Sequence, residues 1–233
     1  MSSLAAQNAS ISRDRRDLYI PDQRTQYDKP DNGRIRFVVV TDLGENRSVE
    51  FAVVDVETTG LDARVDRIIE IAIIIADDGG DVVQRWTSLV QPQRPVDATH
   101  IHGLTDEDLT DAPSFHELIP TIHELITGRV IVAHNVRFDL DFLNAEFERN
   151  GFPLDLPREI GVCTMEQSYI YLPEGRHNLV ACLERAGIER PVHHRSLGDA
   201  ECARELLRFY LYAEETRQRY MHVATNRFGD EIL

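Results

Sequence analysis

Two acidic residues, Asp55 and Glu57, stand at the end of an apolar segment that reads FAVVDVETTG over residues 51–60. The apolar run predicts a buried strand, in which alternate side chains point to the same face. The two carboxylates would then lie about 7 Å apart along the chain. Like charges at the end of a core strand repel each other and lose hydration, which costs free energy unless a positive group lies between them. The pair therefore indicates a site for a divalent cation.

Two more acids occupy comparable places further along the chain. Asp139 follows a predicted strand in AHNVRFDLDF, where Asn135 stands at the expected helix cap, and Asp199 falls in the first turn of the helix predicted after HHR. Strand ends and helix starts gather at one edge of an α/β sheet, so we expect the four acids to meet there. Oxygen ligands suit Mg²⁺ or Mn²⁺. Two such ions are the usual arrangement for in-line attack at a phosphodiester, with a histidine to take the proton of the attacking water.

Each of these residues also has a simpler interpretation. Asn135 could be only a helix cap, and Asp199 could be the acid of a capping box with Ser196. Asp55 and Glu57 could mark a strand end that reaches water. Four acids and a histidine stand at matching points of separate motifs. Independent helix caps would rarely produce that combination, so it favours the metal site.

The elements that must position these residues alternate along the chain. Strands predominate up to residue 91 and helices follow, which predicts an α/β fold with a mixed sheet. Later elements are expected as helices over 114–126, 136–150, 164–171 and 178–186 and from Ser196 past Tyr212, with short strands at 129–134 and 159–163. The aromatic residues Trp86, Phe115, Phe142 and Phe147 are predicted to lie in the core.

Composition limits the class of partner. The formal net charge is −15, so a nucleic acid would have to be held by a local site and its metal ions rather than by a basic surface. The three cysteines form no CxxC pair and are expected to be buried thiols in a reducing, cytoplasmic setting. No apolar run approaches the roughly 20 residues that span a bilayer, so no membrane partner is expected.

The motifs DVETTGL, IHGLT, AHNVRFD and HRSLGDA resemble those of the DEDDh family of 3′–5′ exonucleases. The closest likeness is to the proofreading (epsilon) subunit of bacterial DNA polymerase III and its stand-alone relatives, over roughly residues 51–212. The resemblance implies a ribonuclease-H-like mixed sheet flanked by helices and two Mg²⁺ or Mn²⁺ ions per active site. It also implies the release of nucleoside 5′-monophosphates from 3′ ends.

The resemblance assigns roles to matching positions. The metal ligands would be Asp55, which bridges both ions, with Glu57, Asp139 and Asp199, and the general base would be His194. Substrate-binding positions would be Thr58, Thr59, Gly60, Leu61, His134, Asn135 and Phe138.

We expect residues 1–34 to form a mobile N-terminal arm, 35–50 an added strand and hairpin, 51–215 the exonuclease domain and 216–233 the end of the last helix and a tail. The N-terminal extension could contact a polymerase or another protein. The expected activity is hydrolysis at the 3′ ends of single-stranded DNA. The alternatives are an exoribonuclease acting on short RNA, which the motifs do not distinguish, and a non-catalytic module that binds ends or a polymerase.

Overall fold

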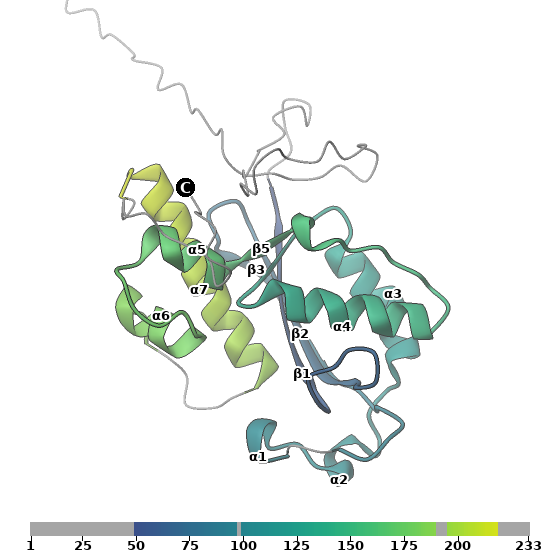
Figure 1. Ribbon diagram of the computed structural model, residues 1–233. Helices are drawn as coiled ribbons and strands as arrows, with labels where there is room; N and C mark the ends of the chain where they lie inside the picture. Colours follow the sequence, from purple (N-terminus) through teal and green to yellow (C-terminus); the bar gives the residue numbers. More distant parts are fainter. Residues whose placement is uncertain (1–48, 97–98, 190–194, 219–233) are drawn as a thin grey trace, which may run out of the picture.

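A five-stranded mixed sheet lies at the centre of the molecule, as the computed structural model in Figure 1 shows. The structure describes residues 49–96, 99–189 and 195–218. The strands are β1 (Phe51–Thr58), β2 (Ile68–Ala76), β3 (Val82–Leu89), β4 (Val130–Ala133) and β5 (Gly161–Cys163). Their order is β3-β2-β1-β4-β5, with antiparallel pairing among the first three and parallel pairing of β1 with β4 and of β4 with β5. The predicted α/β class with a mixed sheet is confirmed.

Helices cover both faces of this sheet (Figure 1). They are α1 (Thr99–His102), α2 (Asp106–Leu109), α3 (Phe115–Ile126), α4 (Val136–Arg149), α5 (Thr164–Tyr171), α6 (Leu179–Ala186) and α7 (Ser196–Glu215), with a 3₁₀ turn at Arg158–Ile160. Helices α3 and α4 pack on one face, and α7 packs on the other with α5 and α6 beside it. The two short helices α1 and α2 lie beyond the end of the sheet at which β1 finishes.

The side chains of β1 alternate between the two layers. Ala52, Val54 and Val56 belong to the apolar cluster under α3 and α4, while Phe51 and Val53 pack against α7. This is the period-two pattern of a strand buried on both faces. Asp55 and Glu57 continue the α7-facing row, so they leave the sheet on the side where α7 begins.

The structure bears out most predicted helix ends. Ser114 and Glu117 form a capping box at the start of α3, and the Asn178 side chain accepts from the Ala181 N–H at the start of α6. Gly187 closes α6 with φ +69°, a left-handed conformation that glycine adopts at no steric cost.

The expected cap at Asn135 is wrong, and the capping-box alternative for Asp199 also fails. Asn135 stands at the N-cap position of α4, but its side chain makes no capping hydrogen bond. Helix α7 has Arg195, not Ser196, at its N-cap position, and no side chain caps it there. Asp199 is therefore not the acid of a capping box with Ser196, and that simpler explanation of Asp199 fails.

The core contains the predicted aromatic residues. Phe115, Phe142 and Phe147 are buried, Trp86 is partly buried against the same cluster, and all three cysteines are buried free thiols. The predicted arm at 1–34 and most of the added strand and hairpin at 35–50 lie outside the described residues, as does most of 216–233. In the part of the chain that the structure describes, no helix is both long and apolar enough to span a bilayer.

Candidate active site

Asp55 and Glu57 reach the site from the carboxyl-terminal half of β1. In the pairing with β2, Asp55 lies opposite Ala72 and Glu57 lies opposite Glu70. The apolar first half of β1 anchors the strand in the core, so the two acids are carried to its end with little freedom to turn away. Both carboxylates are partly buried.

Asp139 comes to the same place through β4 and α4. Strand β4 runs parallel to β1, so the carboxyl ends of the two strands meet at one edge of the sheet, and α4 starts there. Asp139 lies in the first turn of α4 and is buried. Burial raises the pKa of Asp139 to about 8, and Glu57 contributes to the rise, while backbone hydrogen bonds from Asp139 itself and Val56 offset part of it.

Asp199 approaches from the other layer, in the first turn of α7. Its negative charge raises the pKa of both Asp55 and Glu57, which places the Asp199 carboxylate within electrostatic reach of the end of β1. The sheet, α4 and α7 thus bring together the acids that were predicted to meet.

Mutual repulsion dominates the electrostatics of this cluster. Burial raises the pKa of Asp55 well above its ordinary value, and the nearby charges of Asp139, Asp199 and Glu57 raise it further. The pKa of Glu57 rises to about 7, first through burial and then through Asp199. A group of carboxylates that disfavours its own ionisation is stabilised by a bound cation.

A further buried carboxylate, Glu70, lies near the start of β2 and was not predicted as part of the site. It is 4% exposed and stands opposite Glu57. The Arg195 Nε donates to both Glu70 carboxylate oxygens at 3.1 and 3.0 Å, and the Ser196 backbone N–H donates to Glu70 at 3.0 Å. Burial opposes ionisation of Glu70, but these donors outweigh it and lower the pKa of Glu70. An acid inside the apolar run IIEIAIII was the sequence signal that could have indicated it.

The donor set fits divalent metal ions by its chemistry. Asp55, Glu57, Asp139 and Asp199 offer only oxygen atoms, which are the ligands of Mg²⁺ and Mn²⁺. Among the described residues, however, no three or more His, Cys, Asp or Glu side chains are arranged as a group that could hold a metal ion.

The predicted general base, His194, falls in residues 190–194, outside the described part of the chain. Its neighbour Arg195 is bound to Glu70 of β2. Arg195 is therefore tied to the strand that pairs with β1, close to the acids.

The residues that follow β1 use most of their polar groups within the protein. The Thr58 Oγ1 donates to the Gly60 carbonyl at 2.6 Å, and the Thr59 Oγ1 donates to Asp66 Oδ1 at 3.2 Å. A Cβ atom on Gly60 would lie 2.4 Å from Asp66 Oδ2, so any other residue there would require the Asp66 carboxylate to shift. Leu61, by contrast, is 86% exposed.

A pocket of about 440 Å³ opens beside Leu61. Phe138 and Phe142 of α4 form part of its wall, with ring centroids 4.8 Å apart. Polar residues that include Arg64 and Asn144 also line it. Five of the ten lining residues are polar or charged, and three of these are carboxylates, so the pocket combines apolar and charged surface.

His134 is engaged inside the protein. Its Nε2 lies 3.0 Å from the His177 carbonyl oxygen and its Nδ1 lies 3.0 Å from Thr164 Oγ1. A carbonyl can only accept, so Nε2 carries the proton and Nδ1 accepts from Thr164. Burial lowers the pKa of His134 to about 4, so the ring is neutral at pH 7. His134 therefore joins the end of β4 to α5, and the exposed Asn135 next to it faces solvent.

The comparisons with known proteins agree with this geometry. The RNase_T exonuclease family model matches residues 52–207. The chain belongs to this exonuclease family. It is a hydrolase of the 3′–5′ exonuclease class, and the predicted family and enzyme class are confirmed.

Several relatives of the chain are DNA polymerases. The chain is 36% identical over 188 residues to DNA polymerase III PolC-type of Latilactobacillus sakei. The matching region covers 79% of this chain and 13% of that protein. It is 35% identical over 160 residues to DNA polymerase III PolC-type of Bacillus subtilis, which covers 67% of this chain and 11% of that protein. The chain thus spans only a small part of these relatives.

Solved structures share the fold. A complex of Escherichia coli exonuclease I with single-stranded DNA has a TM-score of 0.62 at 21% identity, and it covers 73% of this chain and 41% of that chain. Exonuclease X in complex with 5′ overhanging duplex DNA has a TM-score of 0.55 at 27% identity, and it covers 71% of this chain and 93% of that chain. The ribonuclease-H-like sheet flanked by helices is confirmed.

Proposed function

We propose that the chain removes nucleotides one at a time from the 3′ ends of single-stranded DNA and releases nucleoside 5′-monophosphates. One observation carries the proposal. Asp55, Glu57, Asp139 and Asp199 come from three different elements, yet the charges of the last three each raise the pKa of Asp55. Such a cluster is arranged to bind cations at the phosphate that is cleaved.

The roles that we propose for the residues are those that the resemblance to the exonuclease family implies. Asp55, Glu57, Asp139 and Asp199 would hold two Mg²⁺ or Mn²⁺ ions. When bound, these ions offset the phosphate charge and lower the pKa of water. His194 would take the proton from the attacking water, because the pKa of histidine lies near working pH.

The terminal nucleotide is proposed to lie in the pocket between the loop after β1 and α4. Leu61 and Phe138 both line this pocket and offer apolar contact to a base. The hydroxyls of Thr58 and Thr59 already donate to other groups of the protein. We therefore propose that Thr58, Thr59 and Gly60 face the sugar and phosphate with their backbone. His134 would act as a wall, and Asn135 would face the substrate.

DNA is favoured over RNA as the substrate. The curated relatives are DNA polymerases, and the structural neighbours named above were solved with DNA. The match to a small part of PolC-type polymerases also supports action beside a DNA polymerase. The N-terminal extension is our proposed place of contact. The −15 charge indicates weak, salt-sensitive binding away from the site.

The test uses purified protein with 5′-labelled single-stranded DNA or RNA of the same sequence, in Mg²⁺, Mn²⁺ or EDTA. We expect a metal-dependent ladder that shortens from the 3′ end, faster on DNA. Asp55→Ala should show no ladder, and the matched control Asp81→Ala, at the opposite end of the sheet, should retain it. Faster cleavage of RNA would replace the substrate assignment with the exoribonuclease. The absence of a ladder from folded wild-type protein on both substrates would overturn the proposed function.

A further inference from the structure

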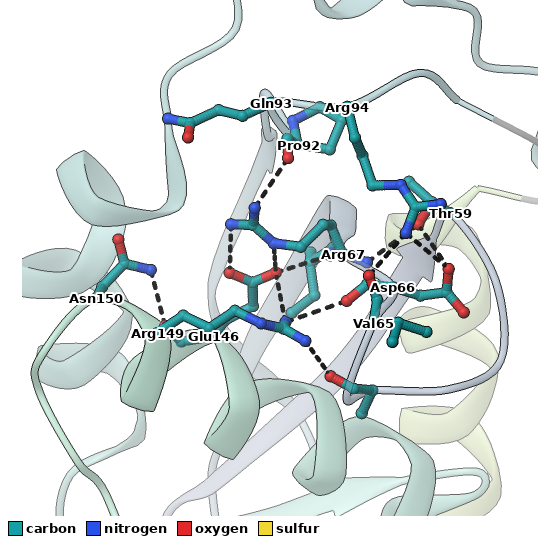
Figure 2. Close-up of polar contacts among 12 residues, drawn as sticks. Thr59, Val65, Asp66, Arg67, Pro92, Gln93, Arg94, Glu146, Arg149 and Asn150 are labelled. Carbon is teal, nitrogen blue, oxygen red and sulfur yellow. Dashed lines mark hydrogen bonds and ion pairs between the residues drawn. The ribbon is translucent and has the colours of Figure 1, made fainter.

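The loop between β1 and β2, residues 59–67, exposes apolar side chains although it lies beside the pocket. Leu61 is 86% and Val65 is 62% exposed, and the loop contains turns but no helix or strand. A single exposed leucine is ordinary on a protein surface. What distinguishes this loop is how firmly other elements hold its backbone, which Figure 2 shows.

A buried carboxylate anchors the end of the loop. Glu146 of α4 is 0% exposed, and it accepts from Arg67 Nε at 2.6 Å and from Arg67 Nη2 at 2.8 Å. The Ile68 backbone N–H also donates to Glu146 at 3.3 Å. A buried carboxylate is tolerated only when it is paired in this way, so the Arg67–Glu146 pair fixes where β2 begins relative to α4.

Arg149, one turn further along α4, holds the middle of the loop. Its Nη1 donates to the Asp66 carbonyl at 3.1 Å, and its Nη2 donates to the Ala63 carbonyl. The same Nη1 lies 3.4 Å from Glu146 Oε1. The planar guanidinium thus connects two loop carbonyls to the buried carboxylate, a geometry that lysine cannot reproduce.

Arg94 holds the loop from the other side, in the segment after β3. Its Nη1 donates to the Val65 carbonyl at 2.7 Å and to Asp66 Oδ1 at 3.1 Å. Asp66 in turn accepts from the Asp62 N–H at 3.0 Å and from Thr59. The loop is therefore closed on itself and clamped between α4 and the segment after β3 (Figure 2).

We propose that Arg149 and Glu146 are positioning residues that hold the 59–67 loop, and with it Leu61, in the conformation that receives the 3′-terminal nucleotide. This inference rests on the proposed function for its substrate. A loop that is already ordered loses little conformational entropy when ligand binds, so the network strengthens binding without touching the substrate. It acts from residues outside the carboxylate cluster.

The kinetic consequence is specific. Contact between Leu61 and the terminal nucleotide is made in the bound substrate and is retained in the transition state. Loss of such uniform binding raises KM and leaves kcat unchanged. Loss or displacement of a carboxylate in the cluster would instead lower kcat.

The primary test is Arg149→Met, which keeps the apolar stem but removes the donors to Ala63 and Asp66. Arg149→Lys keeps the positive charge but loses the planar guanidinium that reaches both carbonyls. The matched control is Arg85→Met on β3, where the arginine pairs with Glu201 at the surface. KM and kcat would be measured on single-stranded DNA with Mg²⁺, well below the unfolding temperature of each variant. Amide hydrogen exchange would be followed in peptides that cover 59–67.

We expect Arg149→Met and Arg149→Lys to raise KM about tenfold with kcat within about twofold, and to speed exchange in the loop. Arg85→Met should match the wild type. Glu146→Gln, which keeps the shape but loses the charge, should show the same direction if it folds. Unchanged KM and exchange in folded Arg149→Met would overturn the inference, and so would a fall in kcat alone. If the wild type cleaves nothing, the proposed function fails, and unchanged loop exchange in Arg149→Met still overturns the positioning role.

Discussion

Glu57 of β1 and Glu70 of β2 are directly paired on neighbouring strands, and the pKa values of their carboxylates shift in opposite directions. Glu70 is bound by Arg195 and by the Ser196 N–H, which lower the pKa of Glu70. The pKa of Glu57 is raised to about 7. Glu70 thus ties the start of α7 to the sheet, whereas the Glu57 carboxylate, in its proposed role, is left to bind a cation.

Replacement of Asp55 separates catalysis from folding. Asp55→Ala should reduce cleavage at least ~10³-fold, because it removes a ligand shared by the proposed metal site. In EDTA its melting temperature should equal or exceed that of the wild type, because a repelled, buried carboxylate is removed. Thermal unfolding and single-turnover cleavage check the two effects. A marked fall in melting temperature would mean that Asp55 supports the fold instead.

Replacement of Arg195 is predicted to lower both the free energy of unfolding and kcat. Arg195→Met leaves Glu70 buried without its main partner, at a cost of about 1–3 kcal/mol, reduced from the fully buried case because the Arg195 side chain is 46% exposed. The start of α7, with Asp199, also loses its tie to β2, so kcat should fall roughly tenfold. Urea unfolding and steady-state kinetics measure both effects. Arg85→Met, which breaks a surface pair, should cost under about 1 kcal/mol and leave kcat unchanged.

The raised pKa of Glu57 predicts how pH and metal act together. The folded protein keeps a proton on Glu57 up to about pH 7, whereas the ordinary value is 4.5, so the folded state binds more protons in that interval. Without metal, the free energy of unfolding should therefore fall as pH rises from about 4.5 to 7. A bound cation removes that penalty, so Mg²⁺ should raise the melting temperature more at pH 8 than at pH 5.5. Equal increments at both values would contradict the proposed cation site.

His194 lies outside the described residues, so its role stays a prediction. His194→Ala should lower kcat by about 10²–10⁴, the usual contribution of a general base. Mn²⁺ binding measured by calorimetry should be unchanged, since His194 is not a proposed ligand. Neighbouring His193 provides the control, and His193→Ala should retain most activity. The reverse ranking would move the base to His193.

Local patterns were enough to predict most of the elements, although not the bounds of the short helices α1 and α2. The helix bounds at α3, α5 and α6 follow from apolar spacing and from caps such as Ser114 and Gly187, which act on their immediate neighbours. The acids Asp55 and Glu57 were visible for the same reason, since charges at the end of an apolar strand conflict with their surroundings. Asn135 shows the limit of such reasoning, because a residue of the right type at the cap position makes no capping bond.

The long-range pairs could not be predicted in this way. Glu70 and Arg195 are separated by 125 positions, and Arg67 and Glu146 by 79. Each of these residues, taken alone, is a common charged side chain, and only the packing of α7 and α4 against the sheet gives it a buried partner. The sequence by itself determined which elements form and which acids are candidates for metal binding, because those depend on near neighbours. The tertiary structure decided which carboxylates repel each other and which are neutralised, because burial and charge act through space and not along the chain.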